Sequence, residues 1–372
     1  MVIGGGRRSG ALDMFERIMG MTTTRVGIVG AGGIARQHAM AWRANEPRGT
    51  LAALADISAQ RAQILSDEYT GGTAKIYGSV DELVADPDID VVDICLPHDL
   101  HAPAVVKAAR AGKAILCEKP LCTTMADAEM IHSVLEETGV TFMMAHNQLF
   151  QPSLIEARKL LALGTIGAPF VMRSVECFQN AGALMGTQGK HDLAPGENPW
   201  AWRADLNRMG GGELLDTGWH ATYRLLALAN ERPIEVSAIT ERFLIPGLPA
   251  EDTGLVNVRF ESGAIGQILT TWAFAAPGNT QFEVMGSLGS LAGTPDSITH
   301  QLHGWEAPAV KPVVNTHTFT AEITHFLDVL GGAESLAPFS VGARVLQVIK
   351  AAYKASVEQR TVALPEDSFH EA

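Results

Sequence analysis

The sequence predicts an α/β protein with a doubly wound parallel sheet in its N-terminal part and a C-terminal α+β domain with an open, mainly antiparallel sheet. Two observations support this prediction. Short apolar segments alternate with helical segments up to about residue 145, and beyond that point strand-like segments follow one another through tight turns. Strands separated by helices pair in parallel through right-handed crossovers, whereas strands joined by tight turns pair antiparallel.

In the N-terminal part, apolar runs predict strands at residues 24–29, 51–55, 91–95, 114–117 and 140–144. Helical patterns lie between them at residues 33–42, 58–69, 101–111 and 125–138. Gly112 and Gly139 stand where the last two of these helices end, as helix-stop signals.

The C-terminal part carries helical patterns at residues 153–163, within 212–230, at 319–330 and at 341–358. Strands are predicted at 166–178, 234–244, 255–260, 264–274 and 280–285, and a Gly- and Pro-rich loop at 179–199. We therefore expect domains at residues 22–146 and 147–372, preceded by a disordered extension at 1–21. Charged residues follow Arg7-Arg8 where an export signal needs an apolar run, and Met21 is a plausible alternative start.

Composition excludes several functional classes. The 372 residues have a formal net charge of −13, which argues against binding to nucleic acid or to an anionic membrane surface. We find no apolar run of about 18 residues that would predict a membrane span. The four cysteines match no zinc pattern, so we expect no metal and a reducing, cytoplasmic compartment.

A glycine-rich loop follows the first predicted strand. Gly30-x-Gly32-x-x-Ala35 fits the dinucleotide-binding fingerprint of Rossmann domains, in which the glycines allow a tight turn and close approach of a pyrophosphate. Gly33 and Ile34 then lie at a helix N-terminus, whose free N–H groups favour phosphate. The alternative is an ordinary glycine-rich turn.

Asp56 stands at the end of the next predicted strand, at the spacing expected for a residue that binds the adenosine ribose. A carboxylate there repels a 2′-phosphate, so the sequence predicts NAD in preference to NADP. The alternative is an aspartate that only begins the following helix.

Lys119 leaves the C-terminal end of a fully apolar strand, within Glu118-Lys119-Pro120. Ligands bind at the carboxyl ends of strands in doubly wound sheets, so this lysine is expected at the nicotinamide end of the cofactor. A partly desolvated lysine there can share a proton with a substrate hydroxyl or polarise a carbonyl. A solvated surface lysine is the alternative.

Asp216 and His220 are four residues apart and would share one face of a helix. The carboxylate would then orient the imidazole, and His220 would act as a general base. The first alternative is an N-cap aspartate beside a packed histidine. The second is a metal site with His191, although no third ligand has motif spacing.

Trp202 and Arg203 lie just before this pair, in a loop. A tryptophan face packs against sugar C–H groups and an arginine donates to hydroxyls, so both are candidate substrate ligands. The alternative is a loop anchored by buried indoles.

From about Thr24 to its end, the chain resembles the Gfo/Idh/MocA family of oxidoreductases. The motifs that carry the resemblance are Gly30-x-Gly32-x-x-Ala35, Pro97-His98-x-x-His101, Gly112-Lys-x-x-x-Cys117-Glu118-Lys119-Pro120 and Asp216-x-Gly218-x-His220. The resemblance implies Lys119 and His220 as a catalytic pair supported by Asp216.

The resemblance also implies that Leu96, Pro97, His101 and Glu118 line the nicotinamide side, with Asn147 among the substrate ligands. It further implies a homodimer or homotetramer through the C-terminal sheet.

Three positions depart from the family pattern. His98 and Tyr223 stand where the family often has Asn and Asp, and the common Asn-x-Arg-Phe appears as Asn147-Gln-Leu-Phe150. We interpret His98 as a loop residue rather than a second titrating group.

The expected function is NAD-dependent oxidation of a secondary alcohol on a sugar or cyclitol. His220 would take the hydroxyl proton while Lys119 stabilises the alkoxide. One alternative is oxidation of a glycoside at the start of a redox-assisted deglycosylation. Another is an NAD-responsive regulator without catalysis, which the joint presence of Lys119, Asp216 and His220 argues against.

Overall fold

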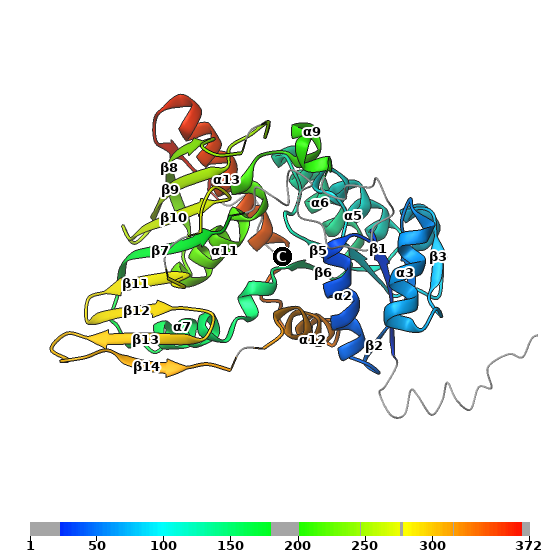
Figure 1. Cartoon of the computed structure of the whole chain (residues 1–372), viewed down its shortest axis with the longest axis horizontal. Coiled ribbons are helices and arrows are strands. Elements are labelled where there is room, and N and C mark those ends of the chain that lie inside the picture. Colours follow the sequence, from blue (N-terminus) through cyan, green and yellow to red (C-terminus); the bar gives the residue numbers. More distant parts are fainter. Residues whose placement is uncertain (1–22, 180–200, 246, 276–277, 315, 367–372) are drawn as a thin grey trace, which may run out of the picture.

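The computed structural model describes residues 23–179, 201–245, 247–275, 278–314 and 316–366. Within these residues the chain forms two sheets that lie side by side, each with helices packed on it (Figure 1). The two sheets correspond to the two architectures predicted from the sequence.

The first sheet is parallel throughout and has the strand order β3-β2-β1-β4-β5-β6. Its strands are β1 (Thr24–Val29), β2 (Gly49–Ala55), β3 (Lys75–Tyr77), β4 (Val91–Ile94), β5 (Ala114–Glu118) and β6 (Phe142–Ala145). The order reverses between β1 and β4, which creates the crevice where doubly wound sheets bind ligands. The sequence missed only the three-residue β3, which is too short to show a period.

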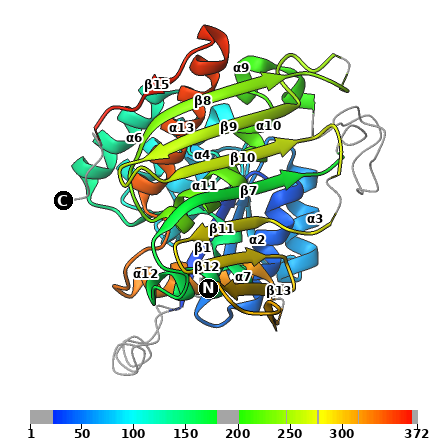
Figure 2. The ribbon, with the colours of Figure 1, turned by 90° about the vertical axis from the view of Figure 1, so that its left-hand side faces the viewer.

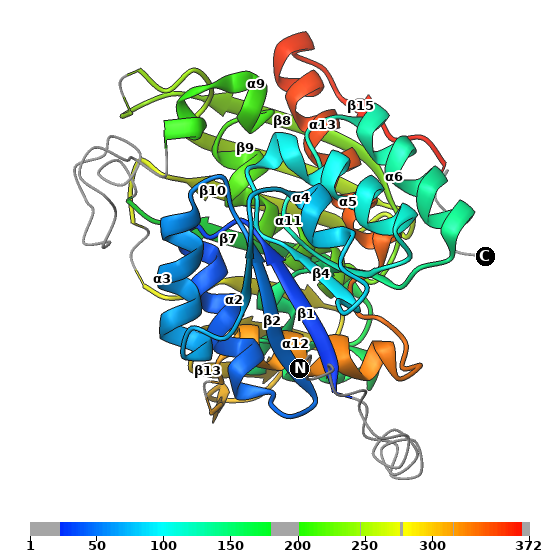
Figure 3. The ribbon, with the colours of Figure 1, turned by 90° about the vertical axis from the view of Figure 1, so that its right-hand side faces the viewer.

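Helices cover both faces of this sheet. On one side lie α2 (Gly33–Ala44) and α3 (Ala59–Thr70), and on the other α5 (His101–Arg110) and α6 (Met125–Thr138), as Figure 3 shows. A short helix, α4 (Val80–Val84), was not predicted. The side chains of Thr124 and Ser58 cap α6 and α3 by accepting a backbone N–H three residues further on.

The second sheet has the order β14-β13-β12-β11-β7-β10-β9-β8-β15. Its strands are β7 (Pro169–Cys177), β8 (Pro233–Glu241), β9 (Thr253–Phe260), β10 (Ile265–Thr271), β11 (Phe282–Gly286), β12 (Gly289–Gly293), β13 (Ser297–Leu302), β14 (Ala309–Pro312) and β15 (Val362–Ala363). Only β7 and β10 pair in parallel, so the predicted mainly antiparallel sheet is confirmed. The sequence missed β12 to β15, whose short polar or glycine-rich segments lack a long apolar alternation.

One face of this sheet packs against α7 (Pro152–Ala162), α11 (Gly218–Ala229) and α13 (Phe339–Glu358). The opposite face is uncovered in Figure 2. On this face Ile239 of β8 and Ile265 of β10 are exposed by 65% and 43%. No helix in the described part of the chain is long and apolar enough to span a bilayer.

The C-terminal helices tie the two halves together. Helix α12 (Thr318–Leu330) packs against α2, where Phe326 contacts Trp42 edge-on with ring centroids 6.3 Å apart. Helix α13 reaches α6, where Phe339 stacks on His132 at 5.3 Å. The crevice at the top of the parallel sheet is therefore closed on one side by elements from the other half.

A buried polar cluster lies at this junction. His38 on α2 has Nδ1 2.9 Å from the carboxylate of Asp93 and Nε2 3.0 Å from that of Glu118. Burial alone would lower the pKa of His38, but the Asp93 carboxylate outweighs it and the pKa is raised well above its usual value. Glu322 on α12 is fully buried, and neither of its carboxyl oxygens has a hydrogen-bond partner among the described residues. Burial raises the pKa of Glu322 well above the usual range, although the nearby His38 acts in the opposite direction.

Glu322→Gln tests the protonation of this carboxyl. A folded-state pKa above the unfolded value means that the folded chain holds a proton that the unfolded chain releases. Stability is therefore lost as pH rises above the unfolded pKa, by up to about 1.4 kcal/mol per pH unit. The neutral variant should match the wild type near pH 5 and exceed its melting temperature at pH 8 by about 2 °C or more. The exposed Glu137→Gln serves as the matched control, and parallel pH profiles for all three proteins would contradict the assignment.

Candidate active site

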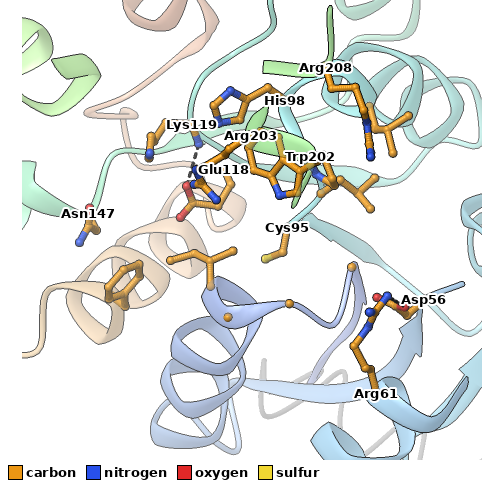
Figure 4. A pocket seen from close by; sticks show the side chains of 18 of the residues that line it. Asp56, Arg61, Cys95, His98, Glu118, Lys119, Asn147, Trp202, Arg203 and Arg208 are labelled. Carbon is orange, nitrogen blue, oxygen red and sulfur yellow. Dashed lines mark hydrogen bonds and ion pairs between the residues drawn. The ribbon is translucent and has the colours of Figure 1, made fainter. Parts of the chain in front are cut away.

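A cavity of about 690 Å³ lies between the two halves, at the carboxyl ends of β1, β4 and β5 (Figure 4). Most of the site residues predicted from the sequence line it. They are Gly30, Gly32, Gly33, Ile34, Asp56, Leu96, Pro97, Glu118, Lys119, Asn147, Trp202, Arg203 and His220. The three that do not line it are Ala35, His101 and Asp216.

The glycine loop fits a dinucleotide. Gly30 has φ +92°, and a Cβ there would lie 2.4 Å from the carbonyl oxygen of Cys95. Gly32 is the N-cap of α2 and provides no side-chain cap, so the first N–H groups of the helix face the cavity without a partner side chain. A Cβ on Gly32 would meet no protein atom within 4 Å, so this space is open to a phosphate. Ala35 is fully buried where α2 packs on the sheet.

Asp56 follows β2 at the far end of the cavity. Its carboxylate accepts hydrogen bonds from the backbone N–H groups of Ala31 and Ser58, both at 2.7 Å, and from Arg61 at 2.8 Å. Ser58, not Asp56, caps helix α3 with its side chain. Sequence reasoning missed Arg61, which also lines the cavity; its signal was a basic residue five positions after Asp56.

Lys119 follows β5, and its side chain reaches across to Asp216 of the other half. Its backbone N–H donates to the carboxylate of Glu118 at 2.9 Å, and the peptide bond to Pro120 is cis. Its Nζ donates to the Oδ1 of Asp216 at 2.7 Å and to the carbonyl oxygen of Asp216 at 3.0 Å. The lysine that the sequence placed at the cofactor's reactive end is therefore anchored on a carboxylate from the other half.

Asp216 does not orient His220, so that prediction was wrong. Helix α10 (Glu213–Asp216) ends at this aspartate and α11 begins at Gly218, so the two residues do not share one continuous helix. The Asp216 carboxylate accepts from Lys119 and from the Nε of Arg203, at 2.6 Å. Burial alone would raise its pKa, but the adjacent Arg203 and Lys119 cations hold it well below the usual range.

His220 has a different partner. Its Nδ1 lies 2.7 Å from the hydroxyl of Tyr223, one turn further along α11. Burial, and then the Lys119 cation, lower the pKa of His220 well below its usual value. The imidazole is therefore neutral at neutral pH, and its Nε2 has no hydrogen-bond partner among the described residues.

Trp202, Arg203 and His98 form one wall. The rings of His98 and Trp202 meet nearly edge-on at 4.6 Å, and the Arg203 guanidinium lies 4.3 Å from the Trp202 ring. His98 was interpreted as a loop residue, but it is 3% exposed, lines the cavity and has Nδ1 3.0 Å from the Met209 carbonyl oxygen. Its Nε2 is 3.9 Å from Asp216. Burial lowers the pKa of His98 well below the usual value.

His101 lies behind the wall that it was predicted to form. It is fully buried, with Nδ1 2.6 Å from the Pro120 carbonyl oxygen and Nε2 2.8 Å from that of Leu96. It thus supports the lining residues from within the domain. Asn147 does line the cavity, and its amide donates to the hydroxyl of Thr318 at 3.1 Å.

Asp216 and His220, two of the three residues weighed for a metal site, do not share a partner. The third, His191, lies outside the described residues. Within the described ranges, one group (His38, Asp93 and Cys95) has ligand atoms within 4.8 Å of one another. Those atoms already contact each other, with the Cys95 thiol 3.7 Å from the Asp93 carboxylate.

Comparisons with known proteins show the family to which the chain belongs. Residues 24–146 match the family model described as "Oxidoreductase family, NAD-binding Rossmann fold", and residues 154–292 match the GFO/IDH/MocA C-terminal domain. A 1,5-anhydro-D-fructose reductase from Ensifer adhaerens is 34% identical over 72% of this chain and 75% of that protein. An inositol 2-dehydrogenase from Rhizobium meliloti is 29% identical over 92% and 99%. The crystal structure of an aldose-aldose oxidoreductase from Caulobacter crescentus superposes with a TM-score of 0.79 and 27% identity, covering 92% of this chain and all of that one.

Gly32→Ala separates dinucleotide binding from folding. Since a Cβ at Gly32 meets no protein atom within 4 Å, the variant should melt within about 1 °C of the wild type. The same methyl group would stand where the pyrophosphate approaches the backbone, so the dissociation constant for NADH should rise at least about tenfold. Binding is measured by NADH fluorescence. The control is Gly78→Ala, which does not line the cavity and where a Cβ would come no closer than 3.7 Å to the Glu82 carboxylate; it should bind as the wild type does. Equal affinity in all three proteins would contradict the placement of the cofactor.

Proposed function

Because the chain belongs to the GFO/IDH/MocA family of NAD-binding oxidoreductases, we propose that it transfers hydride between a secondary alcohol of a sugar or cyclitol and a nicotinamide cofactor. One observation carries the proposal. The glycine loop, Lys119 and His220 line one cavity, and Lys119 is fixed there by the buried carboxylate of Asp216. The same cavity therefore offers a loop suited to the cofactor phosphates and two side chains, Lys119 and His220, suited to the reacting oxygen of a substrate.

The bound nicotinamide would supply the hydride donor or acceptor. The chain's own residues supply the rest of the site. Lys119 places a cationic N–H beside the substrate oxygen and stabilises negative charge that develops there. His220 presents its Nε2 to the same cavity, and Trp202, Arg203 and Asn147 offer an aromatic face and polar groups to the remaining hydroxyls.

Cyclic polyhydroxy compounds are the proposed substrate class. The relatives named above are a reductase of 1,5-anhydro-D-fructose and a dehydrogenase of inositol. The loop that suggested a larger glycoside, residues 179–203, lies largely outside the described residues, so glycosides stay in the substrate screen as the alternative.

We extend the proposal to a homo-oligomer in which two copies pair through the uncovered face of the second sheet. Besides Ile239 and Ile265, this face carries the half-buried Leu255 and Leu269, which stand in register with Ile239 on neighbouring strands. Exposed apolar residues in register across neighbouring strands are a surface on which a second copy could pack.

Lys119→Ala tests the catalytic assignment. The wild type is first screened for NAD reduction with inositols, aldoses and glycosides. With the substrate so identified, the variant should lose at least about a hundredfold in kcat while its NADH dissociation constant stays within threefold of the wild type. The exposed Lys107→Ala on α5 is the matched control. Retained turnover would refute the role of Lys119, whereas tight NAD binding with no turnover of any compound by the wild type would favour a regulator.

Asp56 is the basis for proposing NAD as the preferred cofactor. Its carboxylate repels a 2′-phosphate and also occupies the Arg61 guanidinium, so kcat/KM should favour NAD over NADP in the wild type. Asp56→Ser removes the repulsion and leaves Arg61 facing the same place, which should shift the ratio toward NADP at least about tenfold. The exposed Asp67→Ser on α3 is the control. A wild type that favours NADP tenfold or more would overturn the assignment.

A further inference from the structure

The hydroxyl of Tyr223 lies against one of the two ring nitrogens of His220. Tyr223 lies on α11 with 1% of its surface exposed. Two groups lie within hydrogen-bond distance of its Oη in the described part of the chain. They are the backbone N–H of Gln148 at 3.2 Å and the Nδ1 of His220 at 2.7 Å.

One arrangement of protons satisfies both neighbours of the Tyr223 hydroxyl. A phenol has one O–H to donate and accepts with its lone pairs, whereas a backbone N–H only donates. Gln148 therefore donates to Tyr223, and the phenolic proton has one acceptor, the Nδ1 of His220. If Nδ1 carried the proton instead, the buried phenol would receive two donors and have no acceptor for its own hydrogen, which costs about 1–3 kcal/mol.

We propose that Tyr223 is a positioning residue that holds His220 as the neutral Nε2–H tautomer, so that His220 is a hydrogen-bond donor to the substrate oxygen and not its base. This inference rests on the proposed function. It exchanges the roles expected from the sequence, in which His220 takes the hydroxyl proton and Lys119 stabilises the alkoxide.

The tyrosine ring is itself fixed from behind. His146 stacks on Tyr223 with ring centroids 4.3 Å apart and planes 17° from parallel. The indole N–H of Trp219 donates to the Nε2 of His146 at 2.8 Å, so that nitrogen carries no proton. Burial, with the nearby Lys119 cation, lowers the pKa of His146 to about 3, so the ring is neutral. The three neighbouring rings of His220, Tyr223 and His146 are therefore all neutral.

Lys119 is the group that can exchange a proton. Its ammonium has three N–H groups, of which two are donated to Asp216, so one remains for the substrate oxygen. After that proton leaves, the amine still donates two N–H groups to Asp216 and has a lone pair in the third position. Lys119 can therefore change its protonation state while keeping both bonds, whereas a neutral His220 that gave up its proton would become an imidazolate.

The balanced reaction follows from these roles. In the reducing direction the carbonyl carbon would receive hydride from a reduced nicotinamide, its oxygen would receive a proton from Lys119, and the lysine would be left as an amine that water reprotonates. In the oxidising direction the Lys119 ammonium first gives its third proton to water, and the resulting amine then takes the hydroxyl proton as the carbon passes hydride to an oxidised nicotinamide. In both directions His220 donates one hydrogen bond to the reacting oxygen and its own proton stays on Nε2.

The tautomer is measured directly in full-length protein labelled with ¹⁵N-histidine. Two-bond correlations between ring nitrogens and carbon-bound protons distinguish Nε2–H from Nδ1–H, and His220→Asn assigns the signal. We expect the wild type to show a protonated Nε2 and an unprotonated Nδ1 at pH 7. Tyr223→Phe keeps the ring but removes the donor, so the two nitrogen shifts should converge, and kcat should fall about fivefold, the size of one neutral hydrogen bond.

Tyr353→Phe is the matched control. The hydroxyl of the half-buried Tyr353 also accepts a backbone N–H, from Gly212, and donates to a side chain, Glu251. Its loss should leave the His220 signals unchanged. An Nδ1–H tautomer in the wild type, or unchanged His220 signals in Tyr223→Phe, would overturn the inference; the wild-type spectrum decides even where the variant does not fold. The spectrum needs no substrate, so the inference can fail while the substrate screen succeeds, and the reverse.

Discussion

The carboxylate of Asp216 is the interaction on which the site depends. It is 1% exposed and binds Lys119 from the parallel-sheet domain and Arg203 from the other half. A carboxylate buried without partners costs several kcal/mol, and these two cations offset that cost from the two sides of the domain boundary. These two contacts hold the two halves together beside the cavity, and they fix the direction of the Lys119 side chain. One N–H of Lys119 is then left for a substrate.

The parts of the fold that the sequence predicted well are those with local signals. The strand–helix alternation, the glycine loop and the stop at Gly139 need only neighbours in the chain. The pairing of Asp216 with His220 failed because a four-residue spacing assumes a continuous helix, and the helix is interrupted at Thr217. The partner that prevails, Lys119, is distant along the chain, and no periodicity reports such a contact.

Histidine partners were the least predictable part of the site. Both nitrogens of His101 contact backbone carbonyl oxygens, of Pro120 and Leu96, and a carbonyl gives no signal in a sequence because every residue has one. His98 was assigned to a loop, yet its contact with Trp202 places it on the cavity wall. Tyr223 was visible as a departure from the family pattern. The proposed role of Tyr223 depends on the distance between its hydroxyl and the Nδ1 of His220, which the sequence does not report.

Charge is distributed unevenly around the reacting position, and this has a physical cause. Lys119 and Asp216 form a charged pair on one side, whereas His220, Tyr223 and His146 are neutral on the other, each with a pKa that burial shifts away from the charged form. A second cation on His220 would face the Lys119 ammonium across a poorly solvated space, where like charges repel strongly. The lysine cation therefore itself disfavours an imidazolium, so a site that fixes a protonated lysine on Asp216 favours a neutral imidazole beside it. Donor and proton carrier are then different residues, because Lys119 and Arg203 already share the Asp216 carboxylate and a further cation on His220 would have no carboxylate of its own.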